Sequence, residues 1–307
     1  MNAKQLKLIA IVLGAAVLLY LPRIFRDDGS GGSIDVGDGF RFVLEDAVTR
    51  IDIVEPDNAD TIRLEDGSNG WTVDGYRADE TKMENLLEVL PDLYSDVLVA
   101  RNPTNHTKMG VSESGRRISV YTNGPTPLEF YLGNRDIRGA GYFVRALGID
   151  AVFRLDSRVS GYLNRERDGW RPRTIAAIDT ARVRQIVLQR EGTETVFHRG
   201  DSGWTAGEVA ADSASLQGIL GLLPNLSLTT FTSEEEAEAA DFSQAQAAVE
   251  VFYTTEEAMP ENTPALSLLL IEDEEQGDWL VRHAAGSEVY RLATFTVNRL
   301  LPNNLTP

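Results

Sequence analysis

The sequence contains no cysteine and only three histidines among its 307 residues. The lack of cysteine excludes disulfides, thiolate metal sites, a cysteine nucleophile and a lipid-modified amino-terminal cysteine. Basic residues are also scarce, with 29 Lys and Arg against 47 Asp and Glu and a formal net charge of −18. Because affinity for a phosphate backbone depends on clustered cations, we expect no nucleic-acid partner.

Long apolar runs are missing except near the amino terminus, where Leu8–Pro22 is uncharged. Extended to Phe25, at about 1.5 Å per residue, this run is just long enough for one membrane-spanning helix. A secretory signal peptide is the alternative, but Leu18–Pro22 lacks the small residues of a cleavage site. The basic residues before the run favour a single-pass anchor over residues 1–26 in a bacterial cytoplasmic membrane, with the body on the periplasmic side.

The residues after this run are rich in Gly, Ser and Asp and show no apolar periodicity. This composition predicts a flexible linker over residues 27–41. The rest of the chain divides by its own repetition into an α+β module A over 42–172 and a module B over 173–307.

The repetition is clearest where Gly70–Leu93 aligns without gaps on Gly203–Leu226, with nine of 24 positions identical. A second block aligns Val152–Leu155 on Val289–Leu292 in the same order. Two blocks in the same order indicate two copies of one unit. The predicted fold class is therefore α+β, with an N-terminal transmembrane helix followed by two tandem duplicated antiparallel α+β modules.

Each module begins with short strands rich in β-branched residues, and Trp71 and Trp204 are expected to fill the two cores. Asp79 and Asp212 have the character of helix N-caps before leucine-rich segments of helical spacing. The Asn-Gly pair at 123–124 predicts a hairpin between strands near Ile118–Tyr121 and Leu128–Leu132. A short apolar helix is expected to close each copy.

These repeated features resemble the family known as domain of unknown function 4340. The resemblance rests on Gly70-Trp71, Ala78-Asp79, Leu132-Gly133 and the segment Gly141–Arg145, and it is stronger in the first module. It implies a membrane-anchored accessory protein, often encoded near a gliding-motility-type ABC transport system. The resemblance carries no catalytic residues with it.

Motifs for chemistry are missing. The sequence has no H-E-x-x-H and no G-x-S-x-G, and none of its histidines has a metal-ligand spacing to another. His106, His198 and His283 are expected at the surface or at strand edges. The acidic runs 234–236 and 273–275 have the pattern of solvated faces. We therefore predict no catalytic residue, no metal, no cofactor and no enzymatic activity.

Repeats that keep their cores and vary their loops often bind partners through those loops. The segment Gly133–Gly141 differs in charge from its counterpart Glu272–Gly277, so Arg135, Asp136 and Arg138 are the candidate partner contacts. The expected function is a non-enzymatic accessory or scaffold subunit of a bacterial membrane protein complex, such as an ABC permease with its ATPase. An energy-transducing complex, an envelope glycan or ligand binder, and a tethered hydrolase remain alternatives.

Overall fold

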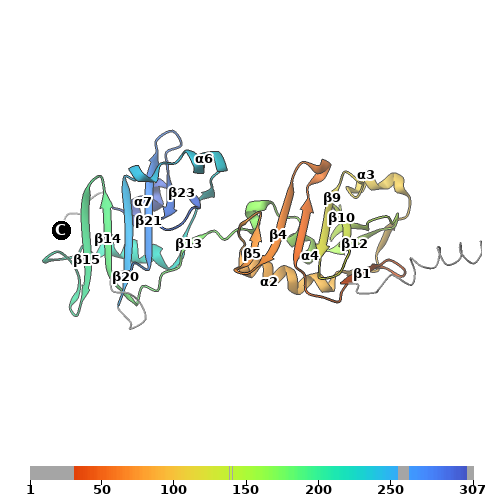
Figure 1. Ribbon diagram of the computed structural model, residues 1–307, viewed down its shortest axis with the longest axis horizontal. Coiled ribbons are helices and arrows are strands. Elements are labelled where there is room, and N and C mark those ends of the chain that lie inside the picture. Colours follow the sequence, from red (N-terminus) through yellow and green to blue (C-terminus); the bar gives the residue numbers. More distant parts are fainter. Residues whose placement is uncertain (1–30, 138, 140, 255–262, 303–307) are drawn as a thin grey trace, which may run out of the picture. The chain divides into compact units, whose positions relative to one another are not determined.

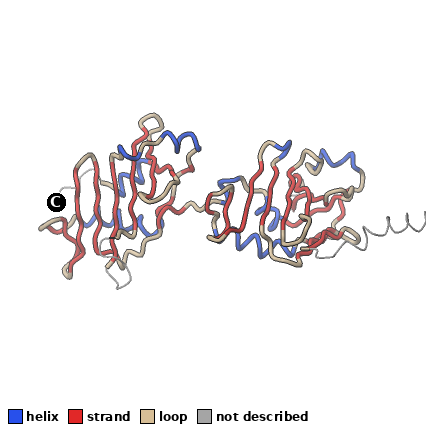
Figure 2. The backbone as a smooth tube through the Cα atoms, in the orientation of Figure 1, coloured by secondary structure: helices blue, strands red, loops and turns tan. Residues whose placement is uncertain are grey.

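The computed structural model describes residues 31–137, 139, 141–254 and 263–302. The chain forms two compact units, the first ending at Pro172 and the second beginning at Arg173 (Figure 1). Most of the regular secondary structure in each unit is strand, with short helices between the strands (Figure 2). The anchor predicted over residues 1–26 lies outside the described residues. In the described part of the chain, no helix is long and apolar enough to cross a membrane.

Within its described residues, the first unit contains a nine-stranded and a three-stranded sheet with three α-helices. Its elements, in chain order, are β1 Gly32–Asp35, β2 Phe40–Leu44, β3 Arg50–Val54, β4 Thr61–Gly67, β5 Gly70–Val73, β6 Tyr76–Arg77, α2 Glu80–Val89, β7 Tyr94–Ser95, β8 Leu98–Ala100, α3 His106–Met109, β9 Arg116–Tyr121, β10 Leu128–Arg135, β11 Gly141–Ala146, β12 Val152–Asp156 and α4 Ser157–Leu163.

The described part of the second unit contains a nine-stranded sheet and a two-stranded pair, again with three α-helices. Its elements are β13 Thr174–Ala176, β14 Val183–Arg190, β15 Thr193–Gly200, β16 Gly203–Ala206, β17 Val209–Ala210, α5 Ser213–Leu222, β18 Leu226–Ser227, β19 Thr230–Phe231, α6 Glu234–Ala239, β20 Ala247–Tyr253, β21 Leu266–Asp273, β22 Asp278–His283, β23 Val289–Ala293 and α7 Thr294–Leu300.

The two large sheets have the same strand order. The first runs β6-β5-β4-β3-β9-β10-β11-β12-β8, and the second runs β17-β16-β15-β14-β20-β21-β22-β23-β19. Neighbouring strands pair antiparallel in both sheets. The predicted α+β class with antiparallel sheets is therefore confirmed, and each element of the first sheet has a counterpart in the second.

Matching helices cover one face of each sheet. The carboxylate of Asp79 accepts the backbone N–H of Lys82 at 3.1 Å, and α2 begins at the next residue. Asp212 caps α5 in the same way, accepting from Ser215 at 2.9 Å. A carboxylate at this position pairs an otherwise free N–H and meets the positive end of the helix dipole, so both predicted starts are confirmed.

Each sheet has its own apolar core beneath its helices. Among the described residues, the core of the first unit includes Met83 and Leu86 of α2 and Leu90, the residue after this helix. The core contains no residue beyond Trp170. The core of the second unit includes the matching Leu216, Ile219 and Leu223 and draws only on residues from Ile175 onward. The repeated leucine spacing therefore reports the buried face of one helix in each unit.

The prediction that Trp71 and Trp204 fill the cores is wrong. Both are only partly buried and pack against the core from its margin. The fully enclosed indoles are Trp170 and Trp279, each with an arginine guanidinium 5.4 Å from the ring centroid. Trp71 and Trp204 lie on strands near a sheet edge, where a large ring closes the end of the core rather than its centre.

The linker predicted over residues 27–41 is corrected in its described part. Gly32–Asp35 forms β1, which pairs antiparallel with β2 from Gly32↔Leu44 to Asp35↔Arg41. Phe40 and Phe42 of β2 are fully buried, and both rings contact Phe130 edge-to-face at 5.8 Å. The Gly/Ser/Asp composition concealed a short strand, which is held by its pairing with β2 and by Ile34 packing against the core of the first unit.

The separation of the cores predicts separable stability. We expect Leu90→Ala, which removes a fully buried side chain, to lower the free energy of unfolding of the first unit by about 2–5 kcal/mol. Leu223→Ala is the matched change in the second unit. Hydrogen exchange read by mass spectrometry should show faster exchange only in the unit that carries the substitution. Equal loss of protection in both units would contradict two independent cores.

Candidate functional site

The hairpin between β10 and β11 holds the candidate contacts chosen from the sequence. Arg135 is exposed and its guanidinium donates to the carbonyl of Gly139 at 3.1 Å. The Asp136 carboxylate accepts from the guanidinium of Arg154 on β12 at 3.2 Å, and its backbone N–H donates to Gly141 at 2.8 Å. Arg138 lies outside the described residues. Asp136 therefore fixes the loop to the sheet, while Arg135 faces solvent.

An apolar surface close to this loop gave no signal in the sequence. Val97, Leu98 and Val99 are 39%, 41% and 39% exposed, and Leu98 and Val99 belong to the edge strand β8. We refer to these three residues as the edge patch. The backbone N–H of Arg154 donates to the carbonyl of Val97 at 3.0 Å, so one arginine joins the edge patch to the hairpin loop. Ile137, next to Asp136, is fully exposed.

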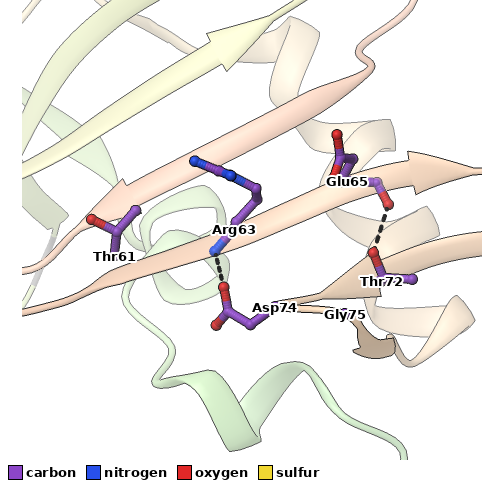
Figure 3. Close-up of a pocket in the computed structure, with 6 residues that line it drawn as sticks. All are labelled: Thr61, Arg63, Glu65, Thr72, Asp74 and Gly75. Atoms are coloured by element: carbon purple, nitrogen blue, oxygen red, sulfur yellow. Dashed lines mark hydrogen bonds between the residues drawn. The ribbon is translucent and has the colours of Figure 1, made fainter.

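A polar cavity of about 440 Å³ lies on the first unit, along β4 and β5 (Figure 3). Its lining residues are Thr61, Arg63, Glu65, Thr72, Asp74 and Gly75. The backbone N–H of Arg63 donates to Asp74 at 2.9 Å. The guanidinium of Arg167 donates to the carboxylate of Asp74 at 2.5 Å and to that of Asp60 at 2.7 Å.

The Arg63 side chain takes part in a row of polar groups across the face of the sheet opposite the helices. Its Nε donates to Asp52 on β3 at 3.1 Å, and this hydrogen bond raises the pKa of the guanidinium. In the same row, the Ser119 hydroxyl on β9 donates to Glu129 on β10 at 2.8 Å. The two arginines at this cavity are therefore each held by a carboxylate, Arg63 by Asp52 and Arg167 by Asp74.

The second unit carries a different row at the same sheet positions. Val187 and Val196 stand where the first unit has Asp52 and Arg63. The serine–glutamate pair remains, but with the two strands exchanged, because the Ser267 hydroxyl on β21 donates to Glu250 on β20 at 3.3 Å. The two units have matching core residues, but the polar residues on this face of the sheet differ between them.

A cavity of about 580 Å³ on the second unit lies over a buried arginine. Arg291 on β23 is the counterpart of Arg154 and is only 4% exposed. Its guanidinium donates to Glu236 at 2.8 Å, to Asp273 at 2.9 Å and to Asp278 at 2.5 Å. The cavity lining combines Arg291, Glu236 and Asp273 with Ala239, Ala240, Asp241, Gln244, Gln246, Ile271, Glu272, Glu274, Glu275, Gln276 and Leu280.

Hydrogen bonds hold two of these carboxylates ionised. The backbone N–H of Ser233, followed by the guanidinium of Arg291, lowers the pKa of Glu236. Arg291 is the main cause of the lowered pKa of Asp273. The sequence interpretation of 234–236 and 273–275 as solvated faces is therefore wrong for Glu236 and Asp273. The recurrence of Arg154 and Arg291 in both copies was the signal that these acids had a partner.

The histidines occupy structural positions. His106 begins α3 and is buried, with Nε2 at 2.9 Å from the carbonyl of Asp150, so its expected surface location is wrong. His283 lies with Nε2 at 2.8 Å from the carbonyl of Ile175, and His198 is exposed on β15. Among the described residues, no group of three or more His, Asp or Glu side chains is placed to hold a metal ion.

These features define a protein of two antiparallel α+β units, with a polar cavity, an acidic cavity and an apolar strand edge at the surface. Residues 71–245 match the family described as domain of unknown function (DUF4340), and the match covers more than half of the chain. The chain belongs to this family. The matched region runs from Trp71 in β5 to Ala245 after α6 and includes the edge patch. No curated protein and no solved structure gives a match to the chain.

The three carboxylates around Arg291 lead to a prediction about stability. We expect Arg291→Met to lower the free energy of unfolding of the second unit by about 3–5 kcal/mol at pH 7, because three part-buried acids lose their cation. Arg154→Met is the matched control, since Arg154 holds the single carboxylate Asp136. Urea unfolding of the two variants should show the smaller loss for Arg154→Met, and an equal loss would contradict the network.

The same acids predict a pH dependence. A carboxylate whose pKa is lowered on folding stabilises the protein above its unfolded pKa, and this contribution is lost as the pH falls through the folded value. The ordinary values are 3.8 for Asp273 and 4.5 for Glu236, so the loss should begin below about pH 4.5. In Arg291→Met the decline should be shallower, because Glu236 and Asp273 lose their cation and Glu236 keeps only the uncharged donors of Ser233 and Gln276. Urea unfolding between pH 3 and 7 measures both slopes, and parallel slopes would refute this cause.

Proposed function

We propose that the chain is a non-enzymatic accessory subunit of a bacterial membrane protein complex, anchored by its amino-terminal segment with its body on the periplasmic side. The edge patch is the observation that carries this proposal. Contiguous exposed aliphatic side chains on a folded protein mark surfaces that another molecule covers. In the edge patch three such residues follow one another along the chain, beside the predicted contact loop.

The state of the charged groups supports a binding role over a catalytic one. A general acid or base needs a proton-accepting atom within reach of substrate and a pKa near the working pH. Asp52 and Asp74 each hold an arginine in the first unit, and Asp273 holds Arg291 in the second. The pKa of Asp273 is also lowered, which moves it away from the range useful for proton transfer.

The kind of complex is proposed from the family resemblance. An ABC-type transport system, with its permease and ATPase, is the first candidate for the partner. Another membrane assembly, for example an energy-transducing one, would require the same anchored layout. Binding of an envelope glycan at one of the cavities is the alternative within the class of binding proteins.

Purification from native membranes tests the proposed function. The full chain with a carboxy-terminal tag, extracted in mild detergent, should retain integral membrane proteins in stoichiometric amounts, identified by mass spectrometry. A permease and an ATPase would support the transport system, and a different assembly would keep the subunit role while removing the transporter. Recovery of the chain alone, also after crosslinking, would contradict the proposal and favour the glycan binder or a hydrolase.

The anchor is tested with the same tagged chain. Full-length protein should stay with the membrane pellet after alkaline carbonate washing, because a spanning helix is not released by high pH. A chain that starts at residue 27 should appear in the supernatant. Release of the full-length chain by carbonate would contradict a membrane-spanning anchor.

A further inference from the structure

The first sheet ends in a strand whose outer side is open. β8 is the last strand in the order and pairs with β12 through Val152↔Ala100 and Phe153↔Leu98. Its other side has no strand partner within the described part of the chain. The pairing with β12 shifts register between these positions, so Val99 is the extra residue of a β-bulge, and Leu98 and Val99 both expose apolar surface along this open edge.

The second sheet provides a comparison at the same position. Its terminal strand β19 pairs with β23 through Thr230↔Arg291 and Phe231↔Tyr290. The exposed residue there is the polar Thr230, and Phe231 is buried. Natural proteins protect edge strands by keeping them short or polar, because an open apolar edge pairs readily with another chain. β19 is short and exposes a polar residue, whereas β8 is short and bulged but exposes aliphatic side chains, although both occupy one place in a repeated topology.

We propose that the open side of β8 receives an extended apolar segment of an integral membrane protein as an additional strand. Backbone N–H and C=O groups along an edge are matched by another extended backbone, and side chains on alternate faces provide specificity. The exposed aliphatic side chains of the edge patch favour aliphatic side chains on the incoming strand. Arg101 and Arg135 are exposed and have no carboxylate partner among the described residues, so an acidic residue flanking that segment would complement them.

The short stretch of chain between the predicted anchor and β1 places this edge near the membrane. This step rests on the proposed function. The predicted anchor ends at residue 26 and β1 begins at Gly32, so about six residues can span no more than roughly 20 Å. β1 pairs with β2, β2 pairs with β7, and β7 precedes β8 by two residues. The occupant is therefore a segment just outside the bilayer, which favours a membrane protein over a freely diffusing one.

Photo-crosslinking in native membranes tests the proposal on the full-length chain. A benzophenone amino acid is placed in turn at positions 97, 98 and 99, with Thr230 and Val209 as controls on other sheet edges. We expect crosslinks from 97–99 to one short stretch of an integral membrane protein. The residues reached from sites 97, 98 and 99 should follow one another in order along that stretch, as backbone pairing requires, while the control sites give none.

A charged substitution tests the same edge independently. Val99→Lys should reduce recovery of that membrane protein by at least about tenfold, because a lysine on the edge disfavours strand addition. Val209→Lys is the matched control, since Val209 is an exposed valine on the edge strand β17 of the second sheet, and its recovery should be unchanged. Circular dichroism checks that both variants fold. If Val99→Lys does not fold, the crosslinks from position 98 still test the proposal.

The other outcomes overturn the proposal in distinguishable ways. Crosslinks only to lipid would make the edge patch a membrane contact, and crosslinks to a second copy of the chain would make it a dimer interface. Crosslinks scattered over unrelated segments of the partner, or equal recovery with Val99→Lys, would remove strand addition while leaving the accessory-subunit role intact. Absence of any membrane-protein partner from the wild-type chain would remove both.

Discussion

The ten-residue helices α2 and α5 each cover one face of a nine-stranded sheet, and the rest of the structure depends on this constraint. The α2 and α5 leucines bury that face, so the opposite face must satisfy its polar groups within the sheet or be covered by short segments. In the first unit the pairing of Asp52 with Arg63 does so across neighbouring strands. In the second unit α6 and the residues after it enclose Phe242, Leu280 and Val289. The cavities, the loops and the open edge all belong to this second face or its rim.

The two copies keep matching residues on the buried face of the sheet and differ in their residues on the exposed face. Asp79 and Asp212 cap equivalent helices, and Leu90 and Leu223 are equally buried. Across the other face, ion pairs in one copy stand where valines stand in the next, and a serine–glutamate pair survives with its partners on exchanged strands. Core residues must change together because their volumes interlock. A serine and a glutamate on neighbouring surface strands can exchange positions and keep their hydrogen bond. The exposed faces were therefore free to acquire separate roles.

Sequence reasoning succeeded where the signal was local. Helix caps, leucine spacing and the Asn-Gly hairpin lie within a few residues of the elements that they predict, and the structure contains them. It failed where the partner lies far along the chain. Phe40 is packed against Phe130, Asp273 is held by Arg291 and His106 meets Asp150, and none of these contacts follows from neighbouring residues. The edge patch was also missed, because Val97–Val99 reads as an ordinary buried strand until the sheet order shows that it ends the sheet.

The position of β1 determines how the first unit bears a load from its amino-terminal side. A pull transmitted along the chain reaches the four backbone pairings between Gly32 and Asp35 before it reaches any fully buried side chain. Phe40 and Phe42 lie beyond them, in the core itself. The pairings of this strand therefore come first in the path of such a load, and the aromatic cluster comes after them.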